Sequence, residues 1–187
     1  VCYKLVPIKT PINPEIPYEM GRVDTEIMYP LVKKWAWGKR KEQEIYYDVE
    51  SRKNSITYRG NMIRLVDQLI KENEIVKAEE ILDLAMEKMP IKDFGFYTLL
   101  EPFINSYYKI GKSDKAREMF EEISKKYQEN LEYYSSISNE NKNRYAEEIY
   151  TDIERYRSLV DVLISYEEGD YLESKMQEFN DYLDLFL

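Results

Sequence analysis

Four pairs of adjacent glutamates are the residues of this chain that could carry out acid–base chemistry. Two carboxyl groups that flank a glycosidic bond can act as general acid and as base or nucleophile. On a helix, however, neighbouring side chains point about 100° apart, which suits a solvated face better than a shared substrate. The pairs are Glu79-Glu80, Glu121-Glu122, Glu147-Glu148 and Glu167-Glu168.

The absence of histidine limits the enzymatic functions open to this chain. It removes the Ser-His-Asp and Cys-His arrangements together with the commonest zinc ligand. The sequence has no glycine-rich phosphate loop and no calcium-loop spacing of aspartates, and Cys2 is its single cysteine. We therefore expect a chain that is not an enzyme, that needs no cofactor and that holds no metal ion.

A short basic segment with two tryptophans is a candidate for contact with a membrane. Tryptophan favours the water–lipid interface and basic residues favour anionic head groups, and the same segment could contact phosphates or sugars. Alternatively, the indole rings pack on a helical core while the basic side chains stay solvated, which is the interpretation that we favour. The residues are Lys33, Lys34, Trp35, Trp37, Lys39, Arg40 and Lys41.

Tyrosine is unusually frequent, with 18 copies. Aromatic rings could stack on sugars or bind peptides, but at helical spacing they more often fill the contacts between helices while their hydroxyls stay in water. We expect one member of each tyrosine doublet to face the core and the other to face solvent. The doublets are Tyr46-Tyr47, Tyr107-Tyr108 and Tyr133-Tyr134.

A repeated helical signature predicts the fold that positions these residues. Ala78, Leu82, Ala85 and Pro90 have the spacing of the second helix of a tetratricopeptide repeat, in which small residues allow close packing and proline ends the helix. A weaker copy follows, with Ala116, Phe120 and Ile123, and with Gln128 in place of the proline. We predict an all-α, tetratricopeptide-like stack of about three antiparallel helical pairs, preceded by an extended proline-rich lead-in and a short helix.

The predicted lead-in covers residues 1–53 and the helical-repeat domain covers residues 54–187. Within the lead-in, we expect a short strand at 3–6 and a helix at 24–37. The expected helical pairs are about 54–89, 93–134 and 141–187, with one long helix from 141 to 166. Five local signals mark them: a cap at Asn54 or Ser55, a kink at Pro102, turns at Gly111 and Gly169, and a capping box of Asp170 with Glu173.

A groove in such a stack should be lined by the first helix of each pair. In this groove Glu101 would repel the terminal carboxylate of a peptide, and Pro102 supplies no donor, so a binder of chaperone tails is not expected. The predicted groove residues are Ile63, Asp67, Ile70 and Lys71 from the first pair and Glu101, Asn105, Tyr108 and Lys109 from the second.

Charge and hydropathy restrict the partners further. The net charge is −9, although residues 1–64 contain 12 basic and only 8 acidic residues, so the helical body is strongly acidic. An acidic surface argues against nucleic acid as a partner. No apolar run approaches the ~20 residues that span a bilayer, and the amino end lacks the plan of a signal peptide. Because the chain begins at Val1, we expect a soluble fragment of a longer protein.

Short motifs along nearly the whole chain carry a resemblance to a known family. They are Leu5–Ile8, Val23–Thr25, Met28-Tyr29, Trp37-Gly38, Arg52, Ser55–Arg59, Asn61, Leu82-Asp83, Met89-Pro90, Tyr107–Lys109, Gly111 and Tyr133-Tyr134. With these motifs the chain resembles the soluble carboxy-terminal region of large bacterial multi-spanning membrane proteins, an uncharacterised family similar to membrane protein O-mannosyltransferases. The resemblance implies a parent in the inner membrane, with this domain on the periplasmic side and the catalytic acids in the membrane part.

Three functions follow as hypotheses. The first is a non-catalytic protein-interaction or scaffolding module of a membrane glycosyltransferase-like protein, which positions a protein acceptor or partner near the membrane. The second is a purely structural or dimerising appendage of that parent. The third is a free-standing sugar-binding or hydrolytic protein, which depends only on the tyrosines and the acid pairs.

Overall fold

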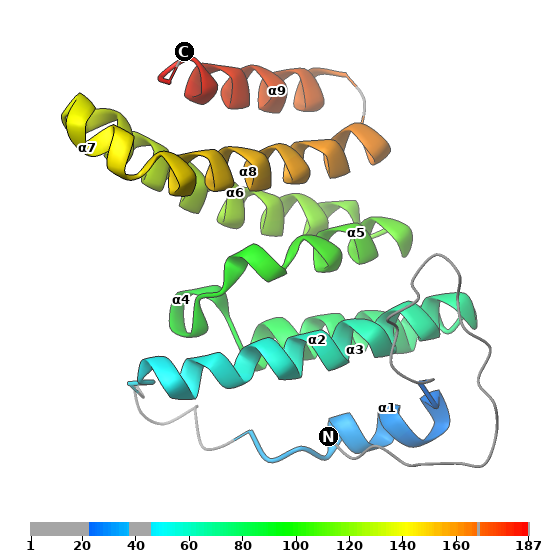
Figure 1. Cartoon of the computed structure of the whole chain (residues 1–187). Helices are drawn as coiled ribbons and strands as arrows, with labels where there is room; N and C mark the ends of the chain where they lie inside the picture. Colours follow the sequence, from blue (N-terminus) through cyan, green and yellow to red (C-terminus); the bar gives the residue numbers. More distant parts are fainter. Residues whose placement is uncertain (1–22, 38–45, 168, 187) are drawn as a thin grey trace, which may run out of the picture.

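A computed structural model of the chain describes residues 23–37, 46–167 and 169–186 (Figure 1). All regular secondary structure in these ranges is helical, which confirms the predicted all-α class. The predicted strand at 3–6 and most of the lead-in lie outside the described residues.

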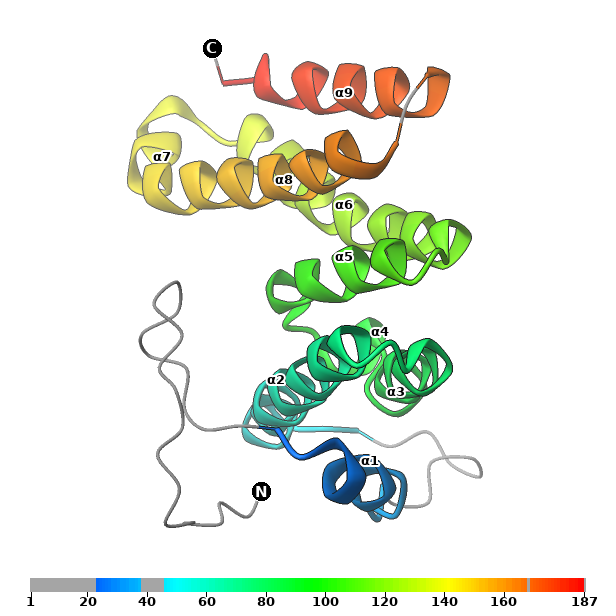
Figure 2. The same cartoon turned by 90° about the vertical axis from the view of Figure 1, so that its right-hand side faces the viewer.

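The helices form a stack that runs from α1 at one end to α9 at the other (Figures 1 and 2). Consecutive long helices pack as antiparallel pairs, α2 with α3, α5 with α6, and α8 with α9, and α1 packs on α2. In chain order the elements are α1 (Thr25–Lys33), α2 (Val49–Lys71), α3 (Ile75–Lys88), α4 (Ile91–Phe94), the 3₁₀ helix η1 (Tyr97–Leu99), α5 (Glu101–Lys109), α6 (Ser113–Ser136), α7 (Asn139–Arg144), α8 (Ala146–Tyr166) and α9 (Asp170–Leu183).

Small buried residues let the second helix of each of the first two pairs lie close to its neighbours. Ala78 and Ala85 of α3 and Ala116 of α6 are 0% exposed. Leu82 and Phe120, the large apolar members of the two signatures, are fully buried as well. The sequence signature therefore identified the core face of both helices correctly.

The turn between α5 and α6 forms where it was predicted, at Gly111. Its φ of 74° lies in the left-handed region, which glycine adopts without a Cβ clash. The backbone N–H groups of Gly111 and Lys112 donate to the carbonyls of Tyr108 and Tyr107, each at 2.9 Å. These bonds satisfy the last carbonyls of α5 and turn the chain back along it.

The predicted cap of the first repeat helix is wrong. Helix α2 begins at Val49, because the carboxylate of Asp48 accepts hydrogen bonds from the backbone N–H groups of Glu50 (2.9 Å) and Ser51 (3.0 Å). These bonds satisfy free amides in the first turn of α2, and Asn54 and Ser55 lie inside the helix, where no cap is needed. The predicted boundary between residues 53 and 54 therefore falls inside α2.

The predicted capping box at the start of the last helix is also wrong. The cap position of α9 is Gly169, with φ of 71°, and no side chain caps the helix. Upstream, the long helix expected from residue 141 is divided at Tyr145 into α7 and α8. The predicted stop at Gly169 is confirmed.

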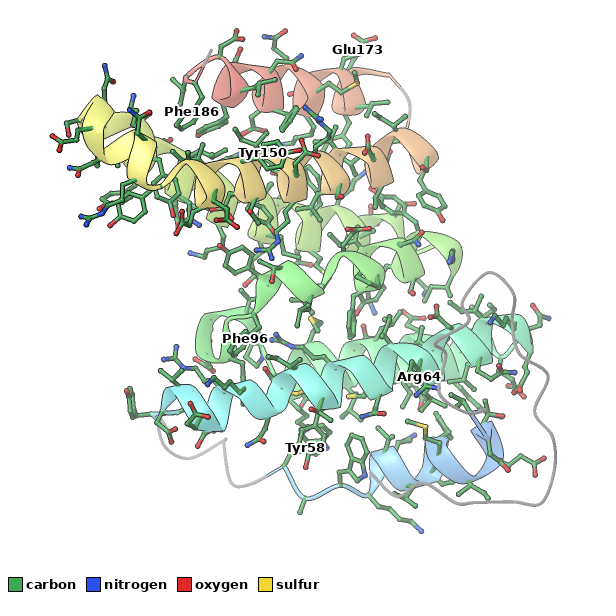
Figure 3. The ribbon with its side chains drawn as sticks, in the orientation of Figure 1. Tyr58, Arg64, Phe96, Tyr150, Glu173 and Phe186 are labelled. Carbon is green, nitrogen blue, oxygen red and sulfur yellow. The ribbon has the colours of Figure 1, made fainter. Side chains whose placement is uncertain are left out.

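The predicted kink at Pro102 does not occur. Pro102 lies in the first turn of α5, where its missing N–H leaves no intrahelical bond unmade. The segment expected to be one helix from about 93 onwards is instead divided into α4, η1 and α5. Between α4 and η1 the backbone passes through Phe96, which has a φ of 48° and lies beside α2 (Figure 3).

Candidate docking pocket between α3 and α6

A hollow between α3 and α6, the second helices of two neighbouring pairs, is the candidate functional site. Its volume is about 280 Å³. This is slightly below the roughly 300–1,000 Å³ of sites for whole small molecules, so it suits a single side chain of a larger partner. The lining residues are Asp83, Met86, Pro90, Ile91, Tyr107, Lys115, Glu118, Met119 and Glu122.

The floor of the pocket is apolar. Met119, Ile91 and Tyr107 are 6%, 4% and 4% exposed, and Met86 is half-buried. Methionine has a flexible, polarisable side chain that adapts to differently shaped apolar groups. Such a floor can receive a large aliphatic or aromatic side chain with little rearrangement of the helices.

One edge of the pocket is a charge-balanced network. The Nζ of Lys115 lies 2.8 Å from Oε1 of Glu79 and 2.7 Å from Oδ2 of Asp83, and the Nζ of Lys112 lies 2.8 Å from Oε2 of Glu79. The hydroxyl of Tyr107 donates to Oδ1 of Asp83 at 2.9 Å. Hydrogen bonds from the two lysines lower the pKa of Glu79, whereas burial raises the pKa of Tyr107 and keeps its hydroxyl protonated.

Two further carboxylates of the lining are not neutralised in this way. Glu118 and Glu122 of α6 are exposed. Within the described ranges, no hydrogen bond or ion pair joins either carboxylate to another residue. The pocket therefore has an apolar floor and a rim with excess negative charge.

A buried arginine supports the pocket from behind. Arg59 of α2 is 1% exposed, and its guanidinium donates to the carbonyls of Met89 (2.5 Å) and Gly95 (2.7 Å). These bonds hold the segment that contributes Pro90 and Ile91 to the lining. Burial lowers the pKa of Arg59 to about 10, so the guanidinium is still charged at neutral pH.

The predicted groove residues lie elsewhere, and none of them lines this pocket. In the second pair, the ring of Tyr108 is buried and stacks on that of Tyr166 with centroids 4.9 Å apart, and Tyr166 also donates to Oδ1 of Asn105 at 2.7 Å. Burial, and then the charge of Asp161, raises the pKa of Glu101. Helix α8 thus covers much of this face.

The remaining predicted groove residues are more accessible. Ile63, Asp67 and Ile70 of α2 are half-buried, whereas Lys71 and Lys109 are exposed. Their role as a binding surface stays a prediction.

The tyrosine doublets follow the predicted pattern in two cases and depart from it in the third. Tyr46 and Tyr133 are 85% and 59% exposed, and the other member of each doublet is half-buried. Tyr107 and Tyr108 are both buried, at 4% and 6% exposed. The prediction was wrong for this doublet because α5 lies between neighbouring elements, so Tyr107 reaches Asp83 of α3 while Tyr108 reaches the end of α8.

The tryptophans of the basic segment pack on α2. The ring centroids of Trp35 and Trp37 lie 5.1 and 5.8 Å from that of Tyr58, which points from α2 toward α1 (Figure 3). Lys33 forms an ion pair with Glu80 at 2.6 Å. Lys34 is exposed, whereas Lys39, Arg40 and Lys41 lie outside the described residues. Membrane contact by this segment stays a prediction.

Sequence reasoning did not find the pocket. Met86 and Met119 each lie next in sequence to a buried residue of one of the two alanine signatures, and nothing in the spacing distinguishes them from core residues. One signal was available: Glu118 and Glu122 follow each other at i and i+4, which places two like charges on one helix face beside Met119.

Comparison of the chain with protein-family models, with curated proteins and with solved structures found no match. Across the ranges that the structure describes, no helix is both long and apolar enough to cross a bilayer. The same ranges contain no group of three or more acidic, histidine or cysteine side chains arranged to hold a metal ion.

Proposed function

We propose that this chain is a non-catalytic protein-interaction module that docks a segment of a protein partner in the pocket between α3 and α6. The observation that carries the proposal is the pocket itself, which has an apolar floor, a polar rim and a volume of about 280 Å³. A well-packed anchor side chain of this kind commonly supplies most of the affinity of a protein interface.

The wider setting is part of the same proposal. Paired helices with buried alanines at the signature positions support a tetratricopeptide-like array, and such arrays commonly present binding surfaces. The family resemblance supports a membrane glycosyltransferase-like parent, with this module on the periplasmic side. There the module would position an acceptor or another protein near the membrane enzyme.

Filling the pocket should abolish docking. Peptides selected from a displayed random library on the wild-type chain should lose at least about tenfold in affinity, roughly 1.4 kcal/mol, when Met86→Trp places an indole in the hollow. Fluorescence anisotropy with labelled peptides measures this change. Val76→Trp is the matched control, because Val76 lies on the same helix, is 72% exposed and does not line the pocket.

Circular dichroism and the melting temperature must first show that both variants fold. Peptides that bind the folded Met86→Trp variant as tightly as the wild type would contradict docking in the pocket. A library that yields no binder at all would contradict the proposal as well.

A structural or dimerising role is the second candidate, and the outer face of α1 favours it. Ile27 and Leu31 lie one helical turn apart and are 56% and 53% exposed. Light scattering over a range of concentrations distinguishes the two roles. A dimer that Ile27→Asp converts to monomer supports the appendage, and a chain that stays monomeric contradicts dimerisation through this face.

A further inference from the structure

The charges that line the pocket do not cancel. Lys115 is matched by Asp83 and Glu79, and Glu79 is shared with Lys112, so this network is neutral. Glu118 and Glu122 remain as two exposed carboxylates on the same rim.

Arg59 offsets the negative charge of this rim only in part. Arg59 is enclosed in the core and directs its donors to backbone carbonyls, and its interaction with Glu122 is electrostatic at a distance rather than an ion pair. The carboxylates of Glu118 and Glu122 can therefore still attract a positively charged group of a partner.

The spacing of the two carboxylates makes a cation the complementary group. Residues at i and i+4 are neighbours on a helix surface, with about 5–6 Å between their Cβ atoms, and like charges at this spacing destabilise the helix slightly. A cationic side chain between them would relieve this repulsion. Phosphate or carboxylate groups would instead add to it.

The apolar floor adds a second requirement. Met119 lies in the sequence between the two glutamates, and its side chain forms the floor with Met86 and Ile91. A partner segment that fills the floor therefore has its neighbouring residues beside the acidic rim.

Building on the proposed function, we infer that the pocket takes a large apolar side chain from a protein segment that carries lysine or arginine next to it. The apolar side chain fills the space over the two methionines, and the basic side chain lies between Glu118 and Glu122. Segments with an acidic neighbour are rejected by the same carboxylates, which gives the site its specificity.

Peptides from the displayed library test this inference. Among peptides that lose binding to Met86→Trp, lysine and arginine should be enriched beside the apolar anchor. For a labelled peptide of this group, the double variant Glu118→Gln with Glu122→Gln should weaken binding about five- to tenfold, and added salt should weaken binding to the wild type. The double variant Glu147→Gln with Glu148→Gln, on exposed residues of α8 away from the pocket, should change little.

The outcomes separate the two proposals. Peptides that need an open pocket but show no basic preference, or that bind the rim variant unchanged, overturn the inference and leave the proposed function standing. A library without any peptide that depends on the pocket overturns both.

Discussion

Replacing Arg59 by methionine should lower the free energy of unfolding by about 3 kcal/mol. The guanidinium of Arg59 is 1% exposed and serves the carbonyls of Met89 and Gly95, which lie in the segment between α3 and η1. Methionine fills a similar volume but donates no hydrogen bond. The cost is therefore that of leaving buried carbonyl groups without a donor.

The same substitution should weaken the pocket. The segment held by Arg59 contributes Pro90 and Ile91 to the lining and contains Phe96, whose φ of 48° is costly for a residue with a Cβ. Without the hydrogen bonds that Arg59 donates, the backbone around Phe96 is held less firmly in this conformation. We therefore expect faster amide exchange at residues 90–96 and weaker peptide binding, even where the variant remains folded.

Urea unfolding followed by circular dichroism measures the stability of the Arg59→Met variant. Arg157→Met is the control, because Arg157 is 47% exposed and forms only a surface ion pair with Glu154 at 3.0 Å. Its loss should change stability by no more than about 0.5 kcal/mol. Equal effects in the two variants would show that Arg59 does not hold the pocket wall.

Replacing Glu167 by glutamine should cost about 2 kcal/mol at neutral pH. The carboxylate of Glu167 accepts from the hydroxyl of Tyr108 (2.8 Å) and from Nε (2.8 Å) and Nη2 (2.5 Å) of Arg117. It is 7% exposed and lies just after α8, so it ties the last helical pair to α5 and α6. A neutral amide keeps the shape but loses the charge and part of the acceptor capacity.

This contribution should disappear in acid. Hydrogen bonds from Arg117 lower the pKa of Glu167 below its ordinary value of 4.5. A carboxyl group with a lowered pKa in the folded state stabilises the fold fully above the unfolded-state pKa and loses that effect as the pH falls through the folded-state pKa. The stability difference between wild type and Glu167→Gln should therefore shrink below about pH 4.5.

Urea titrations at neutral and acidic pH measure that difference. Glu118→Gln is the control, since Glu118 is exposed on α6 and has no hydrogen-bonded partner among the described residues. Its stability should stay within about 0.5 kcal/mol of the wild type at both pH values. A Glu167→Gln deficit that persists unchanged in acid would contradict the role of the ionised carboxylate.

The sequence predicted correctly those features of the fold that depend on residue spacing within one helix or turn. The alanine signatures located α3, α6 and their core faces, and Gly111 and Gly169 located two turns, because each of these features is decided within a few residues. The start of α2 was missed because Asp48 and the polar residues at 51, 54 and 55 could each cap a helix, and only the structure shows that Asp48 does so.

The pocket could not be predicted because it depends on contacts between distant residues. Met86 and Met119 come from different helical pairs. The segment that contributes Pro90 and Ile91 is held by Arg59, which donates to the carbonyl of Gly95, 36 positions later in the chain. In the sequence, nothing in the residues around Arg59 marks its side chain as buried. Its burial and its partners follow from the packing of α2 on the segment after α3.

Methionine-methyl NMR gives the most direct measurement of whether the pocket is a docking site. Titration of the ¹³C-methyl-methionine-labelled chain with a library-selected basic–apolar peptide should shift the Met86 and Met119 signals in a saturable way. Met62, fully buried in α2, and Met176, 40% exposed on α9, provide internal references that should not move. Saturable binding that leaves Met86 and Met119 unshifted would contradict docking between α3 and α6.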